Sequence, residues 1–167
     1  TFLIVQMIKI APPAQTSTTQ NGRSLPRLAL QPVFIVAVLC ATIGNGVMNF
    51  VMVPTPLAMG NHAHSFNMAA SVIQWHVVAM FAPSFITGNL INRFGVTNII
   101  AAGGIMMLLC SAVSMAGTTQ IHFLLALILL GFGWNFMFLG GTTLLTESYH
   151  PHEQSRAQGL HDFIIPL

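Results

Sequence analysis

The chain alternates between long apolar stretches and short polar gaps. Four stretches are long and apolar enough to cross a membrane, at residues 33–58, 69–91, 97–116 and 121–146. About 20 apolar residues, rising about 1.5 Å each, cross a hydrocarbon layer of ~30 Å. We expect helices, because in lipid every backbone N–H and C=O must be bonded within its own segment, and because the ten-residue alternation of a barrel strand is missing. The pattern predicts an all-α integral membrane protein, an antiparallel bundle of transmembrane helices.

Composition supports a membrane setting. Only 5% of the residues are charged, 54% are hydrophobic and the mean hydropathy is +0.75, whereas about a quarter of the residues in a soluble domain are charged. The formal net charge of +2 comes from too few groups to form a basic patch. We therefore expect the lipid bilayer as a partner and exclude nucleic acid.

All basic residues fall on one side of the predicted topology. They are Lys9, Arg23 and Arg27 before the first span, Arg93 between the second and third, and Arg156 after the fourth. The positive-inside rule identifies that side as the cytoplasm. We therefore expect the loop at residues 88–97 to be cytoplasmic.

Both ends of the chain predict further segments. Residues 1–10 are typical of the tail of a preceding transmembrane helix, and residues 157–167 of the start of a fifth span. Residues 11–30 are rich in Pro, Ser, Thr and Gln, so we expect a flexible cytoplasmic linker between two membrane bundles. The membrane domain that follows comprises residues 31–167.

The gap between the second and third spans carries a recognisable motif, "GNLINRFG". It resembles a loop of the major facilitator superfamily with the pattern Gly, any, Leu, any, Asp, Arg, any, Gly. The matching residues are Gly88, Leu90, Arg93 and Gly95, whereas Asn92 replaces the acid. After the fourth span, Pro151, Arg156, Ala157 and Gly159 are similar to a second segment of the family, which contains proline, arginine and alanine or glycine.

The resemblance implies both a fold and a function. The family has twelve helices in two halves, and the linker before the first span favours the second, C-terminal half. The chain then corresponds to helices 7–10, with the tail of helix 6 and the start of helix 11. It would be a fragment of a twelve-helix transporter whose N-terminal half is missing here. The implied function is secondary active transport of a small organic solute by alternating access, of the permease or efflux type, in the bacterial inner (plasma) membrane.

Arg93 admits two interpretations. It is either an anchor that fixes topology, or part of a cytoplasmic charge network with Glu147, Glu153 and Arg156 in which it pairs with one of the acids. Gly95 can adopt the positive φ that ends a helix and turns the chain.

Transport requires polar groups at membrane depth. The candidates for a substrate cavity are Asn45, Asn49, Gln74, His76, Trp134 and Asn135. Asn45 and Asn49 share one helix face, whereas Gln74 and His76, two residues apart, point nearly opposite ways. The alternative for the asparagines is interhelical hydrogen bonding, worth ~0.6 kcal/mol each on average. Since the four spans contain no Asp, Glu, Lys or Arg, a neutral or amphipathic solute is favoured.

Two competing functions remain open. An integral-membrane metalloenzyme is suggested by the pairs His62/His64 and His150/His152, but these lie on opposite sides of the predicted topology and offer too few ligands each. We therefore expect no enzyme activity, metal or cofactor. A bundle without transport activity is the other alternative.

Overall fold

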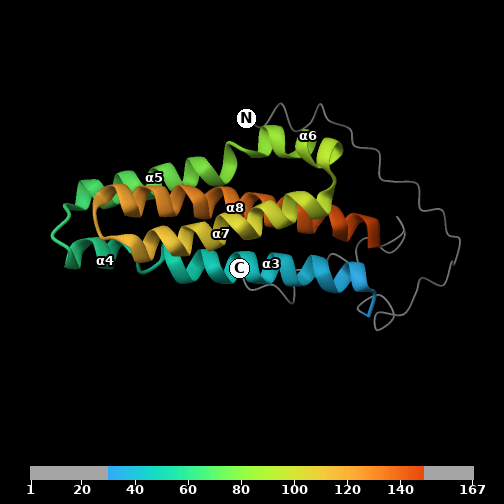
Figure 1. Cartoon of the computed structure of the whole chain (residues 1–167), viewed down its shortest axis with the longest axis horizontal. Coiled ribbons are helices and arrows are strands. Elements are labelled where there is room, and N and C mark those ends of the chain that lie inside the picture. Colours follow the sequence, from blue (N-terminus) through green and yellow to red (C-terminus); the bar gives the residue numbers. More distant parts are fainter. Residues whose placement is uncertain (1–29, 149–167) are drawn as a thin grey trace, which may run out of the picture.

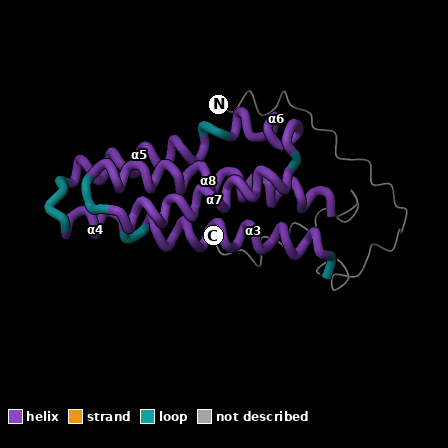
Figure 2. Tube along the Cα trace, viewed as in Figure 1, coloured by secondary structure: helices purple, strands orange, loops and turns teal. Residues whose placement is uncertain are grey.

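The computed structural model describes residues 30–148, which form helices joined by short connections (Figures 1 and 2). The helices are α3 (Pro32–Met52), α4 (Thr55–Asn61), α5 (Phe66–Phe81), α6 (Ser84–Phe94), α7 (Val96–Ala116) and α8 (Gln120–Ser148). No strand occurs in this range, so the prediction of an all-α bundle is confirmed. The expected segments at residues 1–10 and 157–167, and all but the last residue of the expected linker, lie outside the described residues.

Helix α8 is the centre of the described bundle. Its most extensive contacts are with α3, α5 and α7, and it lies between these helices in the ribbon (Figure 1). The chain runs in opposite directions in α8 and in its neighbours α3 and α7, and in the same direction in α8 and α5 (Figure 1). Side chains of three helices can therefore meet on α8.

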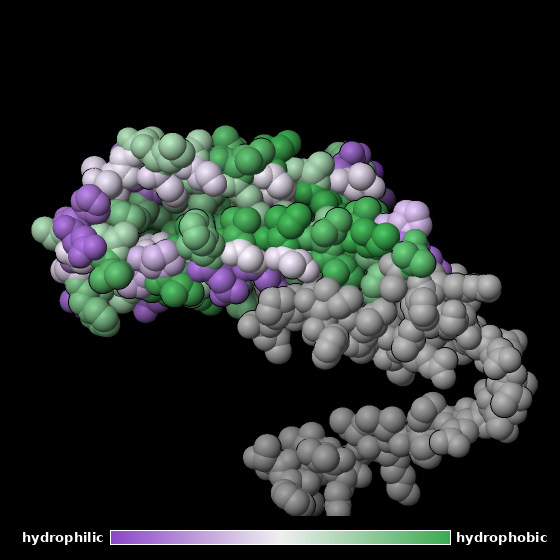
Figure 3. All heavy atoms as spheres, turned by 90° about the horizontal axis from the view of Figure 1, so that it is seen from below, coloured by the Kyte–Doolittle hydropathy of each residue, from purple (hydrophilic) through white to green (hydrophobic). Residues whose placement is uncertain are grey.

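The helices have the length and composition of membrane spans. α3 with α4 (Pro32–Asn61), α7 and the part of α8 up to Thr146 are each long and apolar enough to cross a bilayer, and α5 with α6 make a fourth span if that bent pair is taken as one. Large apolar side chains cover the outer face of α7, where Ile105, Leu108 and Leu109 are exposed. Apolar side chains dominate the middle of the face in Figure 3, whereas hydrophilic ones gather at the end with the α4–α5 connection. This distribution suits a surrounding of lipid.

Proline interrupts two of the spans. Pro54 separates α3 from α4, where the Thr55 hydroxyl donates to the Val51 carbonyl at 2.7 Å. Pro83 separates α5 from α6, whose axes differ by 42°. Proline has no N–H to donate to the preceding turn, so each break leaves backbone carbonyls without their helical partner.

The polar gap between the second and third spans is largely helical. α6 continues through Phe94 and α7 begins at Val96, which leaves only Gly95 between them. Gly95 has a φ of +86°, and its N–H donates to the Ile91 carbonyl at 2.8 Å. A positive φ is readily adopted by glycine, which explains the reversal of the chain within one residue.

Candidate functional site

Four side chains from three helices form an aromatic and amide group, which we call the aromatic–amide cluster. It comprises Asn45 on α3, Phe81 at the end of α5, and Trp134 and Phe138 on α8. The Trp134 ring stacks on Phe138, with centroids 4.8 Å apart and planes 9° apart, and meets the edge of Phe81 at 6.4 Å. The Trp134 indole N–H donates to Asn45 Oδ1 at 2.6 Å.

Local sequence explains why these side chains meet. Trp134 and Phe138 are four residues apart, so they share one face of α8. α3 lies close to that face at Gly44, where a Cβ would be in ordinary van der Waals contact, 3.9 Å from Trp134 Cδ1 and 3.6 Å from Met137 Cβ. Because the Asn45 carbonyl accepts from the indole, the amide NH₂ group of Asn45 can donate elsewhere. The cluster thus combines flat aromatic surface with hydrogen-bond donors.

The polar face of α3 extends from Asn45 in both directions. Thr42 and Asn49 lie three residues before and four residues after Asn45, on the same face of the helix. Asn49 is exposed, whereas the Thr42 hydroxyl oxygen is buried and has no hydrogen-bond partner among the described residues. Sequence reasoning missed Thr42, although its spacing from Asn45 and Asn49 was a usable signal.

Asn135 connects α8 to both sides of the break at Pro83. Its amide nitrogen donates to the Met80 carbonyl and to Ser84 Oγ, both at 2.7 Å, and its Oδ1 accepts from the Thr87 hydroxyl at 2.8 Å. The side chain is 2% exposed. Asn135 therefore supplies a partner for a carbonyl next to the break, and both ends of its amide are engaged within the chain. No pattern in the sequence indicated Ser84 or Thr87 as its partners.

His76 lies in the contact between α5 and α8. Its side chain is fully buried, Nδ1 lies 2.7 Å from the Leu127 carbonyl oxygen, and Nε2 has no partner among the described residues. Gln74, two residues earlier, is exposed. The structure thus places Gln74 and His76, the two polar candidates of α5, on different sides of that helix.

The predicted cytoplasmic charge network is only partly covered by the described residues. The Arg93 guanidinium lies over the Phe94 ring, 5.3 Å from its centroid. Glu153 and Arg156, as well as the side chain of Glu147, lie outside what the structure describes. A pairing of Arg93 with either acid stays a prediction.

At the opposite end of the bundle, histidines join the connections between helices. His64 Nε2 lies 2.8 Å from the Thr118 carbonyl oxygen, and the His64 ring meets Phe123 edge-on at 5.8 Å. His122 Nδ1 lies 2.6 Å from Thr119 Oγ1. Within residues 30–148, no group of three or more His, Cys, Asp or Glu side chains is arranged to hold a metal ion.

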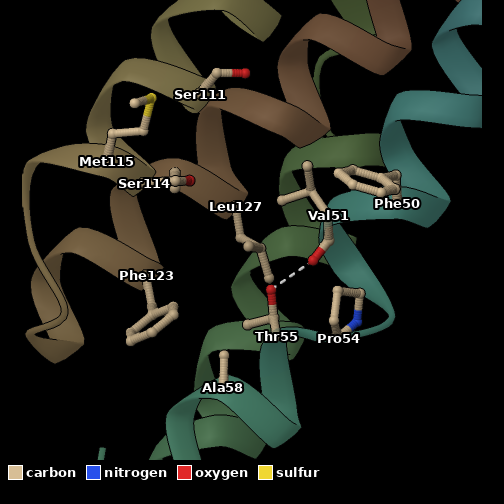
Figure 4. A pocket seen from close by; sticks show the side chains of 11 residues that line it. Phe50, Val51, Pro54, Thr55, Ala58, Ser111, Ser114, Met115, Phe123 and Leu127 are labelled. Atoms are coloured by element: carbon tan, nitrogen blue, oxygen red, sulfur yellow. Dashed lines mark hydrogen bonds between the residues drawn. The ribbon is translucent and has the colours of Figure 1, made fainter.

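A cavity of about 330 Å³ opens between α3, α4, α7 and α8 (Figure 4). Its lining residues are Phe50, Val51, Pro54, Thr55, Ala58, Ser111, Ser114, Met115, Phe123, Ala126 and Leu127. The Ser111 and Ser114 hydroxyls donate to carbonyls of α7, and the Thr55 hydroxyl donates to the Val51 carbonyl of α3. Since these donors are engaged, the cavity offers an apolar surface and is a weaker candidate for a polar solute than the aromatic–amide cluster.

Comparison with known proteins relates the chain to transporters. The family model described as Major Facilitator Superfamily matches residues 2–167. The chain is 45% identical over 145 residues to the riboflavin transporter RfnT of Brucella anthropi, a match that covers 87% of the chain and 36% of that protein. No solved structure matches the chain.

Two further relatives come from Bacillus subtilis and are named as uncharacterized transporters of the same type. YddS is 36% identical over 152 residues, which cover 89% of the chain and 35% of YddS. YdeG is 32% identical over 156 residues, which cover 92% of the chain and 34% of YdeG. The chain thus spans about a third of the length of the curated relatives it matches.

Proposed function

The chain belongs to the major facilitator superfamily, and we propose that it forms part of a secondary transporter that moves a small organic solute across the membrane by alternating access. It is an integral membrane protein, and its relatives are bacterial transporters. We place it in a bacterial inner membrane, with the connection around Gly95 on the cytoplasmic side. Its role is transport, with no chemical change of the solute.

We further propose that the solute is a planar, uncharged heteroaromatic compound of the flavin class. The aromatic–amide cluster is the observation that carries this proposal, because a flat ring system can stack on Trp134 or Phe138 while the amide of Asn45 bonds its polar edge. Apart from Arg93 near the end of α6, the spans between residues 32 and 146 contribute no Asp, Glu, Lys or Arg to pair with a charged solute. The similarity to a protein named as a riboflavin transporter supports the same class.

The other polar residues near the cluster have different roles in the proposed site. Asn49 and Thr42 extend the polar face beside Asn45, so both are available to the hydroxylated part of such a solute. We assign Asn135 to the break between α5 and α6, because its amide is already fully bonded there. Gln74, being exposed beside the buried His76, is left out of the proposed site.

Uptake of riboflavin by liposomes that contain a full-length carrier with this chain tests the proposal. We expect Asn45→Ala and Trp134→Phe to weaken the apparent affinity for riboflavin by about two- to tenfold, which corresponds to one hydrogen bond. Trp75→Phe is the matched control, because Trp75 is 56% exposed on α5, away from the cluster. Absence of riboflavin uptake by the unaltered carrier would refute the flavin class, and equal effects of the two tryptophan changes would refute the site.

A further inference from the structure

The contacts of His76 fix which of its nitrogens carries a proton. Nδ1 lies 2.7 Å from the Leu127 carbonyl oxygen, and a carbonyl can only accept. Nδ1 must therefore be protonated, so in the neutral imidazole Nε2 presents its lone pair. The ring is fully buried, and Nε2 finds no donor among residues 30–148.

The surroundings of His76 favour the neutral ring over the charged one. Between residues 30 and 146 the only Asp, Glu, Lys or Arg is Arg93, which lies at the far end of α6. The helices packed against α5 add His122 and Glu147 on α8 and no titratable group on α4. His122 lies five residues before Leu127 and is bonded to Thr119. A charged imidazole would have no counter-ion here, so Nε2 is suited to accept a hydrogen bond from a neutral donor.

His76 lies close to the aromatic–amide cluster along the contact of α5 with α8. A Cβ at Gly131, three residues before Trp134, would lie 2.9 Å from the His76 carbonyl oxygen and 2.9 Å from Ala79 Cβ. The backbones of α5 and α8 therefore approach one another directly between His76 and the cluster. Phe81, the α5 member of the cluster, is five residues from His76, a rise of about 7.5 Å. This axial rise is shorter than a three-ring heterocycle, and the two side chains leave α5 about 140° apart around the helix axis.

We infer that His76 is a specificity-determining residue whose Nε2 accepts a hydrogen bond from an N–H or O–H group of the transported solute. This inference rests on the proposed transport of a flavin-like compound. Such a compound offers two kinds of donor, the imide N–H of its ring system and the hydroxyls of its side chain. A solute without the right donor would leave Nε2 buried and unpaired, which makes selection by this residue strong.

The break at Pro83 provides a route for the solute to reach His76. In the described conformation the imidazole is sealed between α5 and α8. α5 ends at Phe81 and the chain bends by 42° into α6, so the end of α5 next to Pro83 can tilt away from α8 without moving all of α6, while His76 keeps its contact with the Leu127 carbonyl. Nε2 then becomes accessible in the conformation that binds the solute.

The test combines changes in the protein with changes in the solute. Binding of riboflavin, 3-methylriboflavin and lumiflavin is measured for a full-length carrier, for His76→Leu and for His76→Gln. The first analogue lacks the imide N–H and the second lacks the side-chain hydroxyls. Glutamine keeps a donor for the Leu127 carbonyl and an acceptor for the solute, so it reports on folding as well as on recognition. Ser71→Ala is the control, because Ser71 is exposed on α5 and donates to its own helix.

For the unaltered carrier we expect one of the two analogues to bind about 5- to 150-fold more weakly than riboflavin. His76→Leu should lose this discrimination, whereas His76→Gln should keep part of it and Ser71→Ala all of it. The analogue that discriminates identifies which donor His76 recognises. If the carrier binds riboflavin but the leucine and glutamine variants discriminate as the unaltered carrier does, this inference is wrong and the proposed function stands. If the unaltered carrier binds no riboflavin, both are wrong.

Discussion

At the scale of single residues, the contact between α7 and α8 depends on two glycines. A Cβ at Gly103 would lie 2.9 Å from the Gly133 carbonyl oxygen, and a Cβ at Gly133 would lie 2.9 Å from the Gly103 carbonyl oxygen. Neither backbone can move away from the added Cβ without separating α7 from α8. At the neighbouring Gly104, nothing lies within 4 Å of an added Cβ. Of the adjacent residues Gly103 and Gly104, only Gly104 therefore has room for a methyl group.

We expect Gly103→Ala and Gly104→Ala to change stability in opposite directions. The first forces two helices apart and should destabilise a full-length carrier by about 1–3 kcal/mol, the usual cost of overpacking. The second meets open space and should be neutral or stabilising by up to about 1 kcal/mol, because alanine favours the helix over glycine. Thermal unfolding of the purified carrier in detergent measures both. Equal melting temperatures for the two variants would show that α7 and α8 are not in such close contact.

Only some residues of the aromatic–amide cluster could be predicted from the sequence. Asn45 and Trp134 stood out because polar or amphipathic side chains are rare within apolar spans. Their hydrogen bond joins residues 89 positions apart, and no periodicity within one helix encodes such a pairing. Phe81 and Phe138 were not singled out, because an aromatic side chain in an apolar stretch looks like any other lipid-facing or core residue. The sequence could single out individual members of the site, but it could not show which side chains come together there.

At the scale of elements, the break between α5 and α6 is held by a side chain from another helix. The Asn135 amide bonds the Met80 carbonyl before the break, and the Thr87 hydroxyl after it. The neighbouring residue, Trp134, contacts Phe81 at the end of α5. Two consecutive residues of α8 thus connect the proposed solute site with the hinge, so that a solute stacked on Trp134 can influence the angle between α5 and α6.

We expect Asn135→Leu to destabilise this break. Leucine has a similar volume but leaves the Met80 carbonyl without its partner, which should cost about 1–3 kcal/mol. The loss should appear as a lower melting temperature and a slower maximal rate of riboflavin uptake. Asn98→Leu is the matched control, because Asn98 is exposed and its amide donates only to the Phe94 carbonyl of the preceding turn. A rate and a melting temperature that are equal for the two variants would show that the Asn135 network does not hold the hinge.

The path of the chain through α5 and α6 could be predicted only in part from the sequence. Hydrophobic length located the spans, since any stable helix in lipid needs it. The sequence could not show that α6 continues to Phe94, because the polar stretch from Gly88 to Arg93 reads as a loop when tertiary context is missing. Nor could it show which side chain would satisfy the broken helix, since that depends on how α8 rotates against α5.

At the scale of the whole molecule, the two ends of the bundle differ in charge. Arg93 lies at the end with Gly95, and the connections of α4 to α5 and of α7 to α8 lie at the other. Cytoplasmic loops of membrane proteins are enriched in Lys and Arg. The placement of the basic residues therefore predicts that the His64 and Thr118 end faces outward and that the Gly95 end faces inward.

Labelling of single cysteines in intact cells decides this orientation. Asn61, Thr118 and Asn92 are exposed in the structure, so a cysteine at each is accessible to a reagent that cannot cross the membrane, provided that the site faces outward. The native Cys40 and Cys110 are buried and should add little background. We expect Asn61→Cys and Thr118→Cys to react in intact cells, and Asn92→Cys to react only after the membrane is made permeable. The reverse pattern would invert the topology and would place Arg93 outside, where it could not take part in a cytoplasmic charge network. Labelling of all three in intact cells would mean that α5 and α6 do not cross the membrane as one bent span, and the tilting of α5 proposed for access to His76 would then lose its structural basis.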